Sequence, residues 1–152
     1  MMIRLLLGVA ILAPVVLRAN EATRTTVCAV TSNPKAHSGK TVSVWAHVVV
    51  DYHGTFIAQR GCKKMLPLVL PEGSVQNRRV EVRADETYER FKRALYDYRP
   101  GTSELRKRIE ARFEGRFELI PEDSQGVLGP PGPALGARWQ FVLERVSDVL
   151  LK

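Results

Sequence analysis

The sequence is poor in the residue types that build metal and redox centres, with only two cysteines and three histidines among 152 residues. Cys28 and Cys62 stand 34 positions apart, so they form no Cys-x-x-Cys redox motif and supply only half of a tetrahedral zinc site. Asp51 and His53 are close along the chain, but two ligands are too few to indicate a metal centre. We therefore expect neither a metal nor another cofactor.

Motifs of phosphate binding and of nucleophilic catalysis are also missing. The glycines between residues 126 and 136 are interleaved with prolines and lack the Lys-Ser/Thr ending of a phosphate-binding loop. No serine stands in a Gly-x-Ser-x-Gly motif. Glu114 and Glu118 alternate with arginines along one strand, a pattern typical of cross-strand ion pairs. The sequence thus predicts a protein that is not an enzyme.

Only one long apolar run occurs, near the beginning of the chain. The 13 residues from Leu5 to Leu17 carry no charge and would span about 20 Å as a helix, less than the roughly 30 Å of a bilayer core. This pattern predicts a signal peptide within residues 1–22, cleaved after Ala19 or Ala22. The alternative is a leader that is retained as a membrane tether. No later run is long enough to cross a membrane.

Export would leave a single domain, residues 23–152, in the periplasm or outside the cell. In such an oxidising compartment an even pair of cysteines predicts one disulfide, between Cys28 and Cys62. Removal of residues 1–19, which include Arg4 and Arg18, lowers the formal charge from +7 to +5. The domain stays basic, which favours contact with anionic surfaces or polymers.

Alternation of apolar and polar residues with a period of two predicts a chain rich in β-strands. The turn Asp51–Gly54 predicts a hairpin between the first two strands. Pro67 favours an edge position for the third strand. Gly115 predicts a bend or bulge in the fourth. The predicted strands are residues 42–50, 55–59, 65–71, 109–119 and the segment from 139 onward.

One helix is predicted between the third and fourth strands. Asp85 suits the N-cap position, and Tyr88, Phe91 and Leu95 follow at helical spacing. Arg99-Pro100-Gly101 ends the helix. Three strands, a helix and two strands are the order of a five-stranded antiparallel Greek-key barrel of the OB type. The alternative fold is a two-layer α+β sheet.

Short segments of the chain resemble a family of small exported bacterial OB-fold-like proteins. Asn33-Pro34 and Gly39-Lys40, followed by a valine-rich strand, are similar to the segment that leads into the first strand of these proteins. The run Phe113–Phe117 is similar to their fourth strand. The resemblance implies an OB-like barrel over most of the domain and supplies no catalytic residue.

These observations predict a non-catalytic binding or structural module of the bacterial cell envelope, whose partner is an envelope protein or an anionic polymer. The alternative is OB-type binding of single-stranded nucleic acid or another anionic polymer through a basic, aromatic-bearing barrel face. Exported location makes nucleic acid the less favoured partner. The candidate ligand-binding residues are Trp45, Tyr52, Phe56, Arg78, Arg79, Arg112 and Arg116.

Overall fold

A computed structural model describes residues 21–71, 81–120 and 139–152. Residues 1–20 of the predicted signal peptide and the candidate residues Arg78 and Arg79 lie outside these ranges. None of the helices in the described ranges has the length and apolar character needed to cross a bilayer.

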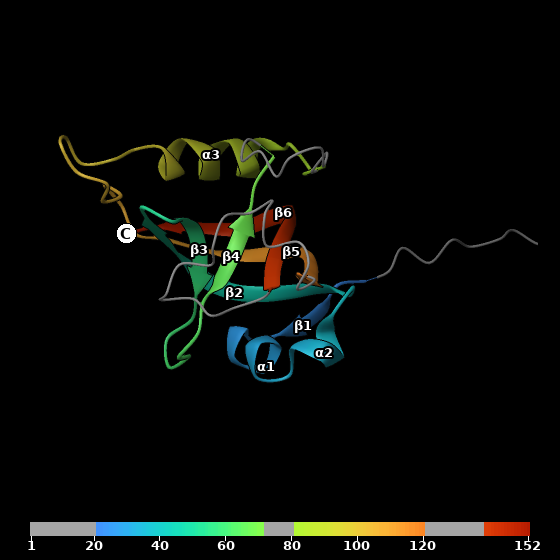
Figure 1. The fold of residues 1–152 in the computed structure, drawn as a ribbon. Helices are drawn as coiled ribbons and strands as arrows, with labels where there is room; N and C mark the ends of the chain where they lie inside the picture. Colours follow the sequence, from blue (N-terminus) through green and yellow to red (C-terminus); the bar gives the residue numbers. More distant parts are fainter. Residues whose placement is uncertain (1–20, 72–80, 121–138) are drawn as a thin grey trace, which may run out of the picture.

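The fold is mainly β and is built around a closed barrel of five strands (Figure 1). Hydrogen-bonded neighbours follow the order β2–β3–β4–β6–β5, and pairing of β5 with β2 closes the ring. This arrangement is consistent with an OB-like barrel and differs from a two-layer sheet. The barrel strands are β2 (Thr41–Asp51), β3 (Gly54–Ala58), β4 (Leu66–Val69), β5 (Ile109–Leu119) and β6 (Trp139–Leu151).

The prediction of an entirely antiparallel barrel is wrong, because strand polarity is mixed. β4 and β6 pair in parallel through Leu68 and Val69, while the other four barrel pairings are antiparallel. A closed ring of five strands cannot alternate in direction all the way around, so one pair must be parallel. The edge position predicted from Pro67 is also wrong, since β4 has neighbours on both sides. Pro67 lies one residue before the parallel pairing begins.

A short strand that the sequence does not predict extends the sheet beside β2. This strand, β1 (Thr23–Thr25), pairs with β2 in parallel, with Thr23 opposite Val42. The segment that follows forms two short helices, α1 (Val27–Ser32) and α2 (Pro34–His37). The Thr26 side chain caps α1 by accepting a hydrogen bond from the Ala29 amide.

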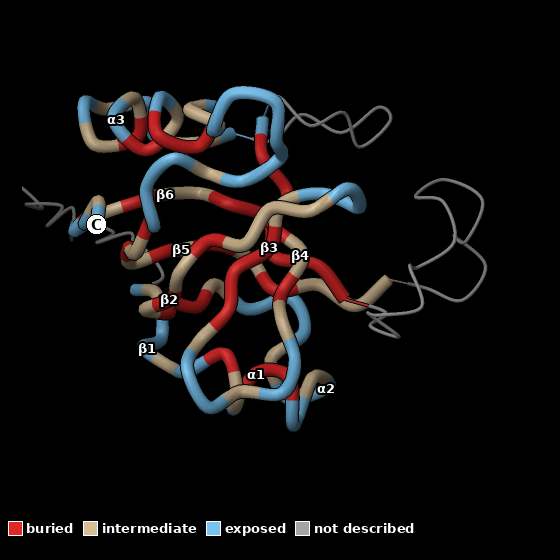
Figure 2. Tube along the Cα trace, turned by 90° about the vertical axis from the view of Figure 1, so that its left-hand side faces the viewer, coloured by how far each residue is buried: buried red, intermediate tan, exposed pale blue. Residues whose placement is uncertain are grey.

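The predicted helix between the third and fourth barrel strands is confirmed as α3 (Glu86–Leu95). The Asp85 side chain accepts a hydrogen bond from the Tyr88 amide at 3.0 Å, as expected of an N-cap. Phe91 and Leu95 are buried against the barrel, and Figure 2 shows the buried side of α3 facing the strands. The barrel separates α3 from α1 and α2, which lie at its opposite end (Figure 1).

The strand β5 has the predicted alternation and the predicted irregularity at Gly115. Its apolar residues point into the core, and Ile109, Phe113 and Phe117 have no exposed surface. The register with β6 shifts between Glu114 and Gly115, so the ladder is irregular where Gly115 predicts it, but the extra residue, Glu144, belongs to β6. A Cβ atom on Gly115 would overlap the carbonyl oxygen of Val142 and lie 2.7 Å from a ring carbon of Phe141. Glycine therefore permits the close approach of the two strands.

The predicted disulfide between Cys28 and Cys62 is present, with the two Cα atoms 5.1 Å apart. It joins α1 to the loop between β3 and β4. The same loop is fixed by the Gln59 side chain, whose oxygen accepts a hydrogen bond from the Val27 amide at 2.9 Å. Val27 and Val30 are fully buried, so α1 is packed on the barrel as well as cross-linked to it.

Candidate functional site

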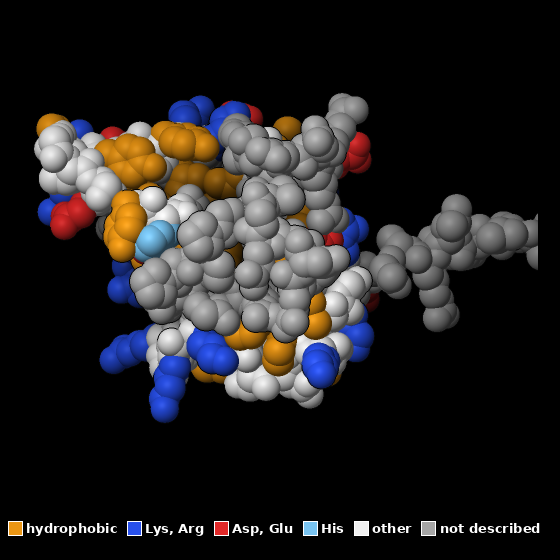
Figure 3. Space-filling view, in the orientation of Figure 1, with side chains coloured by type: hydrophobic (Ala, Val, Ile, Leu, Met, Phe, Trp, Pro, Cys, Tyr) orange, Lys and Arg blue, Asp and Glu red, His pale blue; other side chains and the backbone are white. Residues whose placement is uncertain are grey.

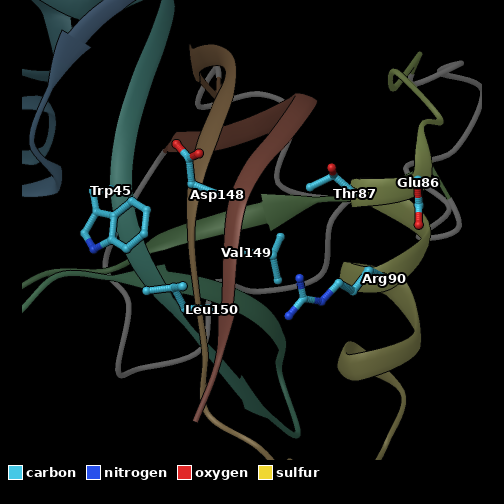
Figure 4. A pocket seen from close by; sticks show the side chains of 7 residues that line it. All are labelled: Trp45, Glu86, Thr87, Arg90, Asp148, Val149 and Leu150. Carbon is cyan, nitrogen blue, oxygen red and sulfur yellow. The ribbon is translucent and has the colours of Figure 1, made fainter.

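A pocket of about 410 Å³ lies where α3 passes beside β2 and β6. Figure 4 shows Arg90 reaching from α3 toward Val149, with Trp45 and Leu150 on the side of the strands. The lining combines apolar surface with both signs of charge. The lining residues are Trp45, Glu86, Thr87, Arg90, Asp148, Val149 and Leu150.

A bulge in β6 shapes the strand side of this pocket. The β5–β6 register pairs Glu110 with Leu150 but Arg112 with Ser147. Asp148 and Val149 therefore stand opposite a single β5 residue. Asp148 has a φ of 53°, a left-handed conformation that aspartate tolerates better than most residues and that is strained by about 1–3 kcal/mol. Bulges redirect side chains and are common beside functional sites.

The bulge determines which side chains of this part of β6 are exposed to solvent. Val149 is buried, whereas Asp148 is exposed and Leu150 retains 46% of its surface. A large aliphatic side chain exposed to this degree beside Trp45 makes an accessible apolar surface. Arg90 stands across the pocket from it and forms no ion pair within the described residues. Trp and Arg are both enriched at protein interfaces.

Arg112, a candidate for anion binding, is held by neighbours within the barrel wall. Its Nε lies 3.4 Å from Oδ2 of Asp148, and its guanidinium lies 5.8 Å from the ring centre of Trp45. Trp45 and Arg112 are register partners on β2 and β5. Arg116 is similarly paired, with its Nε 2.7 Å from Oε1 of Glu118. These two arginines balance carboxylates of the protein itself.

The aromatic candidates are not gathered on one face. Tyr52 is 88% exposed at the β2–β3 hairpin tip, where its ring contacts that of His53 at a tilt of 41°. Trp45 lies six residues back along β2 from Asp51, up to about 20 Å of extended strand. Phe56 is only 2% exposed and therefore offers no accessible ring for stacking.

Charge balance differs sharply between the two ends of the molecule. In residues 81–120 and 139–152, 12 lysines and arginines accompany 11 acidic residues, and ion pairs join many of them. Between residues 21 and 71, six lysines and arginines accompany two acids, Glu21 and Asp51. The excess positive charge thus lies at the end that carries α1 and α2. The scarcity of acids in this segment was a signal already present in the sequence.

His47 belongs to a charged cluster at the junction of β2 and β5. It stands opposite Glu110, which accepts a hydrogen bond from Lys152 at 2.7 Å and pairs with Arg108 at 3.0 Å. Burial lowers the pKa of His47 below 6.5, and the Arg108 charge lowers it further, while Glu110 acts in the opposite direction. The hydrogen bond from Lys152 is the largest of the effects that lower the pKa of Glu110 below 4.5. Within the described ranges, no three His, Cys, Asp or Glu side chains are grouped as metal ligands.

When the pH is lowered from about 7.5 to about 5.5, the free energy of unfolding of the variant His47→Gln is expected to fall less than that of the wild type. The unfolded chain takes up a proton at His47 near pH 6.5, whereas the folded chain takes it up only at lower pH. The free energy of unfolding of the wild type therefore falls as pH decreases through this interval, and Glu110 contributes only below it. Urea unfolding at several pH values measures the slope. Equal slopes for the two proteins would contradict the prediction.

Comparison with protein-family models, with curated proteins and with solved structures finds no match to this chain.

Proposed function

We propose that the protein is a non-catalytic binding or structural module of the bacterial cell envelope, and that it contacts a partner protein through the pocket between α3 and β6. The observation that carries the proposal is the pocket itself, which is lined by exposed Leu150, half-buried Trp45 and exposed Arg90. The walls are formed by a closed barrel and a packed helix. A rigid site of this kind loses little conformational entropy when a partner binds.

The scaffold is, in this proposal, an OB-like barrel. The strand order and the helix between the third and fourth barrel strands support this assignment. A periplasmic or secreted location is compatible with the Cys28–Cys62 disulfide, because such bridges persist in oxidising compartments.

Binding of single-stranded nucleic acid or another anionic polymer across the barrel face has less support. That alternative needs free arginines between accessible aromatic rings. Arg112 and Arg116 are ion-paired, and Phe56 is buried.

The double variant Arg90→Glu/Leu150→Ser tests the pocket. Immobilised wild-type protein should capture a defined envelope protein that remains bound in high salt, and the variant should capture it at least about 30-fold less strongly, as expected when a hot spot is lost. Both residues are exposed, so the variant should fold normally. Quantitative mass spectrometry of captured proteins provides the measurement.

The matched control is Arg93→Glu/Tyr52→Ser, which makes the same kinds of change at two exposed residues outside the pocket. The control should capture the same protein as the wild type. Identical capture by the pocket variant and the control would reject the pocket as the contact site.

A further inference from the structure

The end of the molecule that carries α1 and α2 has a concentrated positive charge. We call this surface the basic end. Figure 3 shows lysine and arginine side chains along the lower margin, where these helices and the β3–β4 loop lie. All six side chains are exposed, and none forms an ion pair within the described residues. They are Arg24, Lys35, Lys40, Arg60, Lys63 and Lys64.

Covalent and hydrogen-bonded links hold the segments of the basic end together. The disulfide places the loop that carries Arg60 and Lys63 against α1, and α2, which carries Lys35, follows α1 directly. The turn after α2 is bound to β5, because the Gly39 amide donates to the Phe117 carbonyl and the Phe117 amide donates to the Lys40 carbonyl. The like charges are therefore held close by the fold in spite of their repulsion.

The two acids of this segment, Glu21 and Asp51, form no ion pair with the six cations within the described residues. Asp51 lies at the opposite end of β2 from Lys40, and its carboxylate accepts a hydrogen bond from the His53 amide. Lys64 has one contact of another kind, since its ammonium lies 5.1 Å from the ring centre of Trp139. The charge of the basic end is thus available to an external anion.

The chemistry of the basic end favours a membrane surface over a nucleic acid. Binding of single-stranded nucleic acid uses aromatic side chains on which bases stack, and the segments 24–40 and 59–71 contain no Phe, Tyr or Trp. Lysines and arginines that are held near an anionic phospholipid surface strengthen binding to it. We propose that the basic end docks the protein on an anionic phospholipid surface. This proposal does not depend on the pocket between α3 and β6.

The triple variant Lys35→Gln/Arg60→Gln/Lys63→Gln tests the proposal. The probes are vesicles of phosphatidylcholine with and without about one-third phosphatidylglycerol, and the protein is the disulfide-bonded chain without residues 1–19, whose barrel and core include none of the removed residues. Each cation near such a surface strengthens binding about fivefold, so the variant should bind about 100-fold more weakly. Wild-type binding should require phosphatidylglycerol and weaken strongly in about 0.5 M salt.

Arg93→Gln/Arg99→Gln/Lys107→Gln is the matched control, because it removes three exposed charges from α3 and the loop that follows it. It should retain wild-type binding within about threefold, since these residues lie far from the docked surface. Equal losses in the two variants would overturn the assignment to the basic end. Absence of vesicle binding, or tighter binding to a single-stranded oligothymidylate than to the vesicles, would overturn the membrane assignment.

Discussion

Replacing Gly115 with alanine is expected to lower the free energy of unfolding by about 3 kcal/mol or more, because the added methyl group has no space. Two of the three atoms nearest to the new Cβ belong to the Val142 backbone. They cannot move away without disturbing the β5–β6 ladder, which also closes the barrel. Phe141, the third neighbour, is fully buried and has little freedom to turn. Urea unfolding of the oxidised protein measures the loss.

Gly101→Ala provides the comparison. Gly101 has a φ of 74°, and a Cβ atom there would have no neighbour within 4 Å. Alanine at this position meets conformational strain alone, which costs about 1–2 kcal/mol. The steric explanation for Gly115 would be wrong if Gly115→Ala destabilised the protein no more than Gly101→Ala does.

Loss of the disulfide is the second large expected effect. The double variant Cys28→Ser/Cys62→Ser should lose about 3–4 kcal/mol of stability, because the bridge closes a loop of about 35 residues and restricts the unfolded chain. The folded barrel should persist. The hydrogen bond from the Val27 amide to Gln59 and the buried side chain of Val30 still hold α1 in place.

Reductant separates the contribution of the bridge from that of the serine side chains. The wild type treated with reductant should approach the stability of the double variant, and the variant itself should not respond. The far-ultraviolet circular dichroism of the variant should match that of the wild type. A stability loss below about 1 kcal/mol, or a response of the variant to reductant, would contradict this account.

Local patterns were sufficient to predict several elements. The alternation over 109–119 predicts β5, because only an extended chain places such residues on opposite faces. Asp85 predicts the beginning of α3, because a capping side chain bonds to an amide three residues away. The irregularity at Gly115 was also predictable, although the carbonyl that requires glycine there lies on β6.

The candidate site was predictable only in part, because it depends on contacts between distant segments. Trp45 was identified as a candidate, and it does line the pocket. Arg112 was a candidate for ligand binding, but its side chain is paired with Asp148, which lies 36 residues away along the chain. Asp148 and Leu150 were missed, since the bulge that redirects them appears only when β6 is aligned with β5.

The mainly β character, the position of α3 and the pairing of the only two cysteines follow from the sequence alone. These features follow from periodicity, from a local cap and from an even count of thiols. The tertiary structure decided the parallel β4–β6 pair, because a closed ring of five strands cannot alternate throughout. The tertiary structure also determines which of the described lysines and arginines form no ion pair. Ion pairing depends on the acids that neighbouring segments bring within reach, and among the described residues no acid pairs with a cation of the basic end.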